Sequence, residues 1–420
     1  MSAILCLNAG SSSVKFSLYR YSPDASLLLT GSVSGLTADQ QYLTYTSYKS
    51  SSEVLESIKN QEIDCPDHDS AFKVFMEHLD SKIGENRLLS IDDICVACHR
   101  IVHGGGNPRP LLITEEVYHE LDILSDLAPL HNQRALDIVH SCISRLKGTK
   151  NVAFFDSSFH MTIPRHIYTY PIDLDVQKRH QIRKYGFHGL SYAFITHETA
   201  DYFGVDEGDL NIIALHLGSG ASACAILGGK SINTSMGLTP LEGLPGATRS
   251  GSVDPSLIFH YHSDSSRMST ASSKDVHLTI AEDILNKRSG WQSITGTTDF
   301  GLITKRAVEE NDELAKLAFD MFVDRVSMYV GQYWVALQGK AIALVFAGGI
   351  GEKGKELRTA VIEKVSCLGF TIDEELNITA STSSDVVYDV SKKDAEVKTL
   401  VVQTDEQLQM AKEVIATRLE

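Results

Sequence analysis

Two arginines lie beside glycines or small residues, where a guanidinium can reach an anion. Arg100 comes shortly before three consecutive glycines, 104–106, and Arg249 stands between two hydroxyl residues near the end of segment 236–251. Arginine binds carboxylates and phosphates through paired hydrogen bonds, and a long apolar segment without regular structure is usually a lid or a binding element. Both arginines are therefore predicted to bind anions. A surface arginine near a flexible loop is the alternative for Arg100.

Two segments, 4–18 and 212–226, carry the same pattern. Each predicts a strand, a tight turn of glycine and small hydroxyl residues, and a strand running back. Backbone N–H groups in such turns are uncrowded by side chains, so oxyanions can approach them closely. The first is not a Walker A loop, which needs GxxxxGK[ST] before a helix, and an ordinary hairpin turn is its alternative. The repetition predicts a duplicated fold that binds a polyphosphate.

Other candidates are an acid and two histidines. Asp156 follows an apolar run that reads as a strand, and ligands collect at the carboxyl ends of strands in α/β sheets. It could bind Mg²⁺, hold an arginine, or cap a helix. His188 lies close to two glycines, and His131 stands just ahead of an expected helix, 132–147. A lone histidine is more often structural, so both roles stay open for these two.

Strands and helices alternate along the whole chain, which indicates an α/β fold. Apolar spacing predicts a long helix over 312–338 and a strand over 341–346. A glycine-rich turn, 347–352, follows and resembles a nucleotide-binding turn, although it is not GxGxxG; a plain strand-to-helix turn is the alternative. A capping-box pattern over 404–407 places Glu406 in the first turn of the last helix.

The composition is that of an ordinary globular protein of two or three domains, with 420 residues and a formal net charge of −16. That charge disfavours nucleic acid and acidic membranes as partners. Seven scattered cysteines predict a reducing compartment, and Cys95 and Cys98 are expected to be buried core thiols rather than redox or metal ligands. No secretory signal or membrane-length apolar run is present, so a cytoplasmic location is expected.

Taken together and in their order, these segments resemble the acetate kinases, members of the acetate and sugar kinase, Hsp70 and actin superfamily. The resemblance covers essentially the whole chain. It implies α/β architecture with two duplicated actin-like ATPase (ribonuclease H-like) domains and a catalytic cleft between them. The expected domains are residues 1–156 with 405–420, and residues 157–404. A homodimer is also implied, as is metabolic coupling to an enzyme that makes or consumes acetyl phosphate.

The resemblance further implies roles for individual residues. The catalytic group is Arg100, Arg249, His188, Asp156 and His131. The phosphate and ATP group is Asn8, Ser11, Ser13, Lys15, His216, Gly218, Ser219, Gly220, Asp299, Phe300, Gly348, Gly349, Ile350 and Gly351. The substrate pocket is Arg100 with Val102, Leu130, Phe187 and Pro240, of which the last four are expected around the acetate methyl group. The Mg²⁺ ligands, with Mn²⁺ as an expected substitute for Mg²⁺, are Asn8, Asp156 and Glu406.

Four positions depart from the family pattern. Ser219 stands where the HLGNG turn has asparagine, and Gly301 stands where the SDxRD motif has arginine. Lys353 replaces the asparagine of GGIGEN, and Gln407 replaces the second glutamate of a usual pair. The first concerns contacts with phosphate, and the second and third concern nucleotide affinity or choice. None removes a residue expected to do the chemistry.

The expected reaction is the Mg²⁺-dependent, reversible and direct in-line transfer of a phosphoryl group between ATP and acetate. A carboxylate acceptor is already ionised at neutral pH and needs no general base. Alternatives within the family are a propionate or other short-chain acyl kinase and a pyrophosphate-dependent acetate kinase. A different class, an Hsp70-like ATP switch, leaves Arg100 and Arg249 without a use and is disfavoured.

Overall fold

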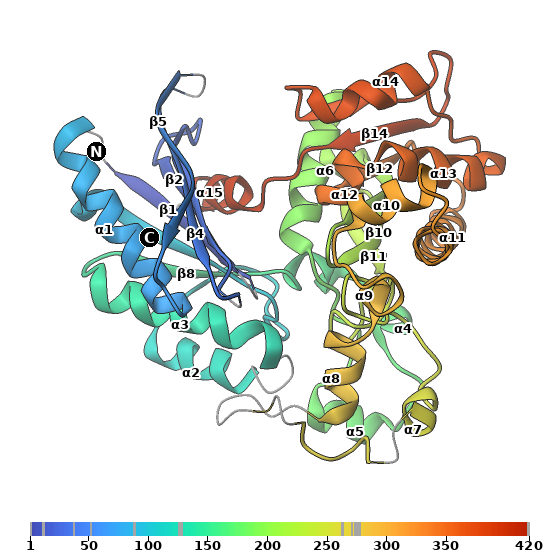
Figure 1. Ribbon diagram of the computed structural model, residues 1–420, viewed down its shortest axis with the longest axis horizontal. Coiled ribbons are helices and arrows are strands. Elements are labelled where there is room, and N and C mark those ends of the chain that lie inside the picture. Colours follow the sequence, from blue (N-terminus) through green and yellow to red (C-terminus); the bar gives the residue numbers. More distant parts are fainter. Residues whose placement is uncertain are drawn as a thin grey trace. The chain divides into compact units, whose positions relative to one another are not determined.

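Two compact units make up the protein in a computed structural model (Figure 1). The structure describes residues 2–10, 13–36, 38–50, 53–86, 90–124, 129–261, 264–269, 272 and 279–417. The first unit consists of Met1–Ser158 and Asp405–Glu420, and the second unit consists of Phe159–Thr404. The chain therefore leaves the first unit, forms the whole second unit, and returns.

The first unit is built on a sheet with the strand order β5-β4-β3-β2-β1-β6-β8-β7 over the described residues. Its strands are β1 (Ala3–Ala9), β2 (Ser13–Arg20), β3 (Leu27–Ser34), β4 (Gln41–Ser50), β5 (Glu53–Ile63), β6 (Ile94–Ile101), β7 (Leu111–Leu112) and β8 (Lys150–Phe155). Its helices are α1 (His68–Asn86), α2 (Glu115–Leu124), α3 (Pro129–Arg145) and α15 (Glu406–Thr417).

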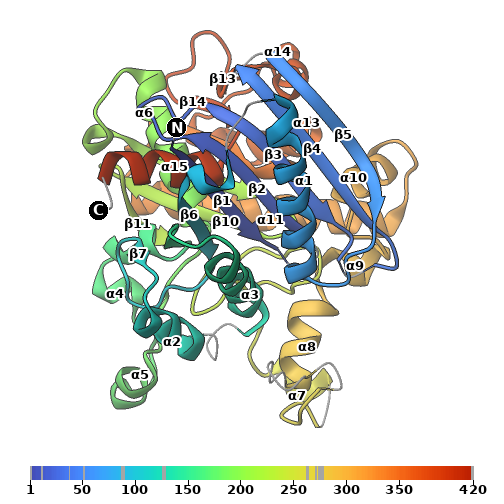
Figure 2. The same cartoon turned by 90° about the vertical axis from the view of Figure 1, so that its left-hand side faces the viewer.

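The sheet of the first unit is covered on both faces. Alternate residues of β1 and β2 point toward α1 and α3 and form a core that includes Leu5, Phe16 and Phe75, as expected from the two-residue period of a strand. α15 packs on the opposite face, against β1 and β2 (Figures 1 and 2). The first turn of the last helix thus lies next to the carboxyl end of β1, where Asn8 Nδ2 donates to Glu406 Oε2.

The second unit is built on a sheet with the strand order β11-β10-β9-β12-β14-β13. Its strands are β9 (Asn211–Leu217), β10 (Ala221–Leu227), β11 (Lys230–Thr234), β12 (Ala343–Ala347), β13 (Val387–Asp389) and β14 (Lys398–Val402). Its helices are α4 (Arg165–Tyr168), α5 (Leu174–His180), α6 (Gly189–Phe203), α7 (Leu257–Tyr261), α8 (Ile280–Lys287), α9 (Gly290–Thr295), α10 (Phe300–Val308), α11 (Glu313–Ala336), α12 (Gly348–Lys353), α13 (Lys355–Val365) and α14 (Glu374–Thr379).

Five strands of each sheet share one topology, which confirms the predicted duplication. In each unit, three consecutive antiparallel strands form a meander, and two later strands run parallel to the first strand of that meander. The resulting orders are β3-β2-β1-β6-β8 and β11-β10-β9-β12-β14. The registers also correspond, because Asn8 pairs with Arg100 on the neighbouring strand, and His216 pairs with Ala347. Equivalent strand ends therefore carry the candidate residues in both units.

Predicted elements agree with the structure within a few residues. The long helix is α11, Glu313–Ala336, and the strand before the glycine-rich turn is β12, Ala343–Ala347. The turn itself differs from expectation, because Gly348–Lys353 forms a short helix, α12. The thiols are free, with Cys98 buried and Cys95 half-buried in β6.

Candidate functional site

Four polar side chains meet at one edge of the sheet in the first unit. Asn8 lies at the end of β1, Arg100 near the end of β6, and Asp156 directly after β8; these are three adjacent parallel strands. Glu406 comes from the first turn of α15. Because the carboxyl ends of neighbouring parallel strands open at the same edge, the topology itself brings residues from distant parts of the sequence together.

Arg100 is held from several directions at once. Its Nε and Nη2 donate to the two carboxylate oxygens of Asp156 at 3.0 and 2.7 Å, and its Nη1 lies 2.8 Å from Glu406 Oε2. Nη1 also donates to Asn8 Oδ1 at 3.3 Å, and Asn8 Nδ2 donates to Glu406 Oε2 at 3.0 Å. Of the alternatives for Asp156, holding an arginine is therefore what the structure shows.

The charges in this cluster do not balance. Burial by itself lowers the pKa of the Arg100 guanidinium, but the carboxylates of Asp156 and Glu406 outweigh it and hold that pKa above its usual value. Two carboxylates against one guanidinium leave one negative charge in excess. Carboxylate and amide oxygens are hard donors, and Mg²⁺ is usually bound by one or two carboxylates together with substrate phosphates. The donor set of Asn8, Asp156 and Glu406 therefore fits Mg²⁺.

The start of α15 corrects one detail of the capping-box interpretation. Asp405, not Thr404, caps the helix, because its Oδ1 accepts from the backbone N–H groups of Gln407 and Leu408 at 3.0 and 2.9 Å. Glu406 still lies in the first turn, as predicted. The Gln407 side chain donates to Cys6 O at 3.0 Å and ties α15 to β1. This departure from the family pattern thus has a structural use.

Arg249 is the candidate anion-binding arginine of the second unit, and its surroundings differ from those of Arg100. It is half-buried, and no ion pair among the described residues involves it. Burial lowers its pKa to about 10, so it stays charged at neutral pH. A buried charge without a counterion is costly unless something binds it. Arg249 is therefore better suited than Arg100 to receive an anionic ligand.

Gly220 lies directly against Arg249. A Cβ atom at position 220 would come 2.3 Å from Arg249 Nη2 and 3.7 Å from His188 Nε2. The turn formed by Gly218, Ser219 and Gly220 is fixed from the other side, because Ala247 N donates to Ser219 O at 2.8 Å. The glycine turn and both candidate catalytic side chains of this unit therefore form one site.

His188 and His216 stack on each other. Their ring centroids are 4.1 Å apart with an interplanar angle of 28°. His188 Nδ1 lies 2.8 Å from Ser222 Oγ, and His216 Nδ1 lies 2.7 Å from Ser191 Oγ. His188 has a left-handed backbone, with φ of 60°, at the N-terminus of α6. Such a conformation is uncommon for a residue other than glycine, and here it sets the direction of the ring.

The long segment 236–251 is anchored rather than loose. The Tyr170 hydroxyl donates to Glu242 Oε2 at 2.6 Å and accepts from Leu238 N at 2.8 Å. Lys184 Nζ lies 3.2 Å from Glu242 Oε1. These contacts hold the segment, so Arg249 at its end has a defined position.

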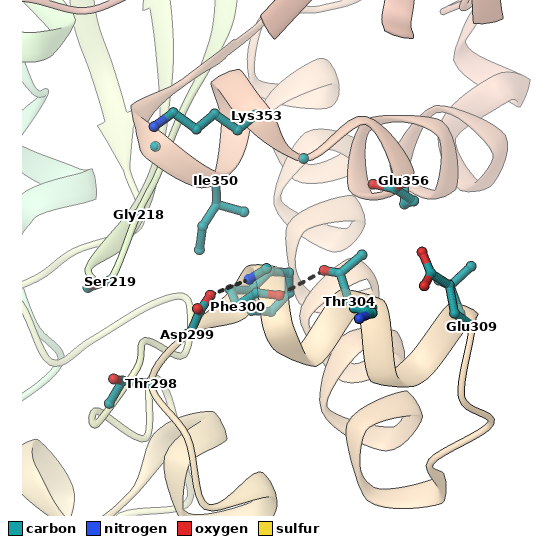
Figure 3. A pocket seen from close by; sticks show the side chains of 15 residues that line it. Gly218, Ser219, Thr298, Asp299, Phe300, Thr304, Glu309, Ile350, Lys353 and Glu356 are labelled. Carbon is teal, nitrogen blue, oxygen red and sulfur yellow. Dashed lines mark hydrogen bonds between the residues drawn. The ribbon is translucent and has the colours of Figure 1, made fainter.

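A cavity of about 450 Å³ lies beside the same glycine turn in the second unit (Figure 3). Its lining residues come from the turn, from α10 and the residues next to it, from α12, and from the start of α13: Gly218, Ser219, Thr298, Asp299, Phe300, Gly301, Thr304, Lys305, Val308, Glu309, Gly349, Ile350, Lys353, Gly354 and Glu356. Figure 3 shows the Ile350 side chain reaching from α12 toward Phe300. Six residues predicted to bind the nucleotide line the cavity, and so do three of the four departures from the family pattern, Ser219, Gly301 and Lys353.

Some predicted nucleotide residues have structural duties. Asp299 caps α10, accepting from Gly301 N and Leu302 N, while Phe300 packs its ring on Trp291 and Phe322. Gly348 and Gly351 are buried and are not among the cavity residues; a Cβ at 348 would come 2.8 Å from Leu217 O. Close packing of α12 on β9 therefore explains the first glycine of this turn.

Packing also explains the glycines after Arg100. A Cβ at Gly104 would come 2.2 Å from Phe155 Cγ, and Gly105 has φ of 57°. Close approach to β8 requires glycine here, whether or not a ligand approaches.

The remaining predicted residues fall into three groups. Lys15, on β2, is exposed and is the cross-strand neighbour of Asn8, and Ser13 begins the same strand. Ser11 lies outside the described residues, as do the side chains of Leu130 and His131. Of the expected methyl pocket, Val102 is half-buried in the first unit, and Phe187 and Pro240 are buried in the second. These placements leave the methyl pocket a prediction.

The sequence did not predict the hydroxyl groups of Ser222, Tyr192 and Ser191, which contact His188 and His216 directly or through one another. Ser222 follows the glycine turn in β10, and Tyr192 and Ser191 lie one turn into α6. Thr404 contacts Ser191 with 2.9 Å between the hydroxyl oxygens. A signal was available for α6, because residues three and four positions after His188 share its face of the helix.

The described part of the chain contains no helix with the length and apolar character that crossing a membrane requires.

A sequence model of the acetokinase family matches residues 3–412. The chain belongs to the acetokinase family. A probable acetate kinase of Neurospora crassa is 52% identical, with 97% of this chain and 92% of that protein covered. Among solved structures, an acetate kinase of Porphyromonas gingivalis matches with a TM-score of 0.82 and 32% identity over 100% of both chains. A propionate kinase of Francisella tularensis matches with a TM-score of 0.82 and 34% identity, covering 98% of this chain and 99% of that one.

Membership in the acetokinase family agrees with the site described above. The resemblance stated from the sequence is confirmed, and so is the α/β fold with duplicated actin-like domains. Membership makes the protein a phosphotransferase with a carboxyl group as acceptor.

Proposed function

We propose that this protein catalyses the reversible, Mg²⁺-dependent transfer of a phosphoryl group between ATP and acetate, giving ADP and acetyl phosphate. The observation that carries the proposal is Arg249, a half-buried guanidinium without an ion pair among the described residues, packed against a glycine turn and close to His188. Family membership supplies the reaction class. Phosphoryl transfer consists mainly of positioning and charge stabilisation, which is what this arrangement offers.

In the forward direction an acetate oxygen forms a bond to the γ-phosphorus, and the bond from that phosphorus to the β,γ-bridging oxygen breaks. ADP leaves with the electron pair, and no phosphoenzyme is formed. The acetate carboxylate is ionised, so no general base is needed. What it needs is compensation for the repulsion between two anions, and Arg249 and Arg100 are assigned this role. His188 is assigned as a hydrogen-bond donor to the transferred group.

The nucleotide is assigned to the cavity beside Ser219. Gly349 and Ile350 on one wall and Phe300 on the other offer flat and apolar contacts to a base or ribose. Pyrophosphate has no part that would use these contacts, so the cavity favours ATP over pyrophosphate as the donor. Ser219 and Lys353 also line the cavity, and their polar side chains are assigned to phosphate or ribose oxygens.

Magnesium is assigned to Asn8, Asp156 and Glu406. When bound, it neutralises charge on the phosphate oxygens. Asn8 and Glu406 also bind Arg100, so the same side chains that would hold the metal fix the orientation of this guanidinium. Lys15 and Ser13, on the strand that pairs with the Asn8 strand, are assigned to the phosphate.

The proposal extends to organisation. We take residues 1–156 with 405–420 and residues 157–404 as the two domains. A cytoplasmic location is supported by free cysteines at all seven positions. A homodimer is supported by exposed apolar side chains such as Phe259 and Tyr261 on α7, which are 72% and 60% exposed. Light scattering coupled to size-exclusion chromatography tests the dimer.

A second candidate substrate is propionate, because a propionate kinase is among the structural relatives. An apolar pocket separates acids that differ by one methylene by only ~1–3 kcal/mol. Propionate is therefore expected to react more weakly than acetate. The half-buried Val102 is the side chain assigned to this discrimination.

A hydroxamate-trapping assay of the acyl phosphate tests the function, with acetate, propionate and butyrate crossed against ATP, GTP and pyrophosphate. Acetate with ATP is expected to give the highest kcat/KM. The Arg249→Ala variant is expected to lose roughly 10³-fold or more in kcat while remaining folded. Arg325→Ala is the matched control, since Arg325 is exposed on α11 and its Nη1 lies 3.3 Å from Oδ2 of the neighbouring Asp324. A near-normal kcat for Arg249→Ala contradicts the assignment.

A further inference from the structure

The ring of His188 is held by a buried pair of hydroxyl groups. Ser222 Oγ lies 2.8 Å from His188 Nδ1 and 2.6 Å from the Tyr192 hydroxyl. Ser222 and Tyr192 are both 0% exposed. They come from β10 and α6, so two different elements fix their positions. No role in the reaction has been assigned to either residue above.

The direction of these hydrogen bonds follows from the number of protons available. Most buried polar groups in proteins are hydrogen-bonded, and Ser222 Oγ is an acceptor within reach of the Tyr192 phenol. The serine oxygen then accepts from the phenol and has one proton of its own to donate. His188 Nδ1 is the other group within its reach. Nδ1 is therefore an acceptor, and the ring proton lies on Nε2.

Two further observations agree with this direction. Burial raises the pKa of Tyr192 well above its usual value, so the phenol keeps its proton. The backbone of His216 also contacts the phenol oxygen and lowers that pKa. A contact with this effect stabilises the phenolate and is therefore an N–H donor, which leaves Ser222 to receive the phenol proton.

The charges around the ring favour the neutral form. A Cβ atom built on Gly220 would lie 2.3 Å from Arg249 Nη2 and 3.7 Å from His188 Nε2, so these two nitrogens are close to each other. A face of the His188 ring stacks on His216, from β9, with 4.1 Å between the ring centroids. A second positive charge on His188 would be repelled by Arg249.

We propose that Tyr192 and Ser222 are positioning residues that keep His188 as the neutral tautomer with its proton on Nε2, directed to the side where Arg249 lies. His188 then serves as a neutral N–H donor and not as an imidazolium. The expected effect of this arrangement on kcat rests on the proposed function, whereas the tautomer of His188 does not depend on it.

The direct test is nitrogen-15 NMR of protein labelled in histidine, with the His188 signals assigned from a His188→Gln variant. In the neutral tautomer the two ring nitrogens have widely separated chemical shifts, and on protonation these converge. The wild-type protein is expected to show a protonated Nε2 and an unprotonated Nδ1 at neutral pH. A protonated Nδ1, or an imidazolium, overturns the proposal whatever the activity.

Variants separate positioning from general stability. Ser222→Ala is expected to give a mixture of tautomers for His188 and to lower kcat by roughly 10- to 100-fold. This is the range found when a group that orients a metal-ligating histidine is removed. KM for ATP is expected to stay within about twofold. Tyr192→Phe, which keeps Ser222, is expected to have a smaller effect of the same kind. Ser191→Ala is the matched control, because it removes the same type of contact from His216 and is expected to leave the His188 signals in place.

An unchanged His188 tautomer in folded Ser222→Ala protein overturns the proposal, and so does an equal response of His188 to Ser191→Ala. Tyr192→Phe and the wild-type spectrum decide the matter if Ser222→Ala does not fold. If the predicted tautomer is found but no acyl phosphate is formed, the proposed function fails and the positioning role of the two hydroxyls stands.

Discussion

Replacing Gly220 by alanine tests whether Arg249 must stay where the structure places it. The added Cβ would lie 2.3 Å from Arg249 Nη2, whereas ordinary contacts of a Cβ are 3.4–4 Å. The guanidinium must therefore retreat by more than about 1 Å. Gly220 is not among the glycines with positive φ, so alanine is compatible with its backbone, and the clash is with the far end of a flexible side chain.

Misplacing a catalytic group by about 1 Å can cost ~10²-fold in rate. We therefore expect kcat of Gly220→Ala to fall about 100-fold in the hydroxamate assay, with a change of less than about 1 kcal/mol in the free energy of unfolding. Gly331→Ala is the control for the substitution itself, since a Cβ at that position on α11 meets nothing within 4 Å.

A double-mutant cycle shows whether the loss acts through Arg249. If it does, Gly220→Ala costs little once Arg249 is already alanine, because the displaced group is gone. A full further 100-fold loss in the Arg249→Ala background would refute this reasoning and place the effect on a contact between the turn and phosphate. A normal kcat for Gly220→Ala alone would refute the assigned position of Arg249.

Three further outcomes follow from the burial of titratable side chains. Arg358→Met removes four hydrogen bonds, two to the carbonyls of Gly351 and Glu352 and two to Asn377. The free energy of unfolding, measured by denaturation, should fall by ~2–4 kcal/mol. KM for ATP, measured from initial rates, should rise because α12 lines the cavity. Burial lowers the pKa of His99 and His160 to about 4, below the value of about 6.5 in the unfolded chain. The stability that these neutral side chains contribute is therefore complete above pH 6.5 and is lost as the pH falls toward 4. In His→Gln variants the free energy of unfolding should depend less on pH over that window, which acid denaturation measures. Burial lowers the pKa of Arg249 to about 10, so kcat should decline as the pH rises through 10, and a rate unaffected up to pH 11 would contradict its role as a cation.

Strand pattern and glycine turns made much of the fold predictable. The repeated strand–turn–strand segments gave the two equivalent hairpins, and a broad apolar face gave α11. The glycine-rich turn after β12 was misjudged in form, because helix α12 begins within it. A six-residue helix is stabilised by packing on β9 and by Arg358, which no local pattern encodes.

The candidate site was predictable in its residue types and less so in its contacts. Asp156 was left with three possible roles, and only the meeting of β6 and β8 shows that it binds Arg100. Arg249 has no ion pair among the described residues, and its place at the end of segment 236–251 depends on long-range contacts of Glu242 with Tyr170 and Lys184. Long-range pairing of this kind has no signature at short sequence distance.

The contribution of α15 to the first unit has a consequence for synthesis of the protein. Glu406 is translated after the entire second unit, yet it completes the group around Asn8 and Arg100. While the ribosome is still making residues 159–404, the first sheet lacks both this carboxylate and the helix that covers one of its faces. A nascent chain is thus expected to expose that face until α15 docks, and activity should begin only at that late step.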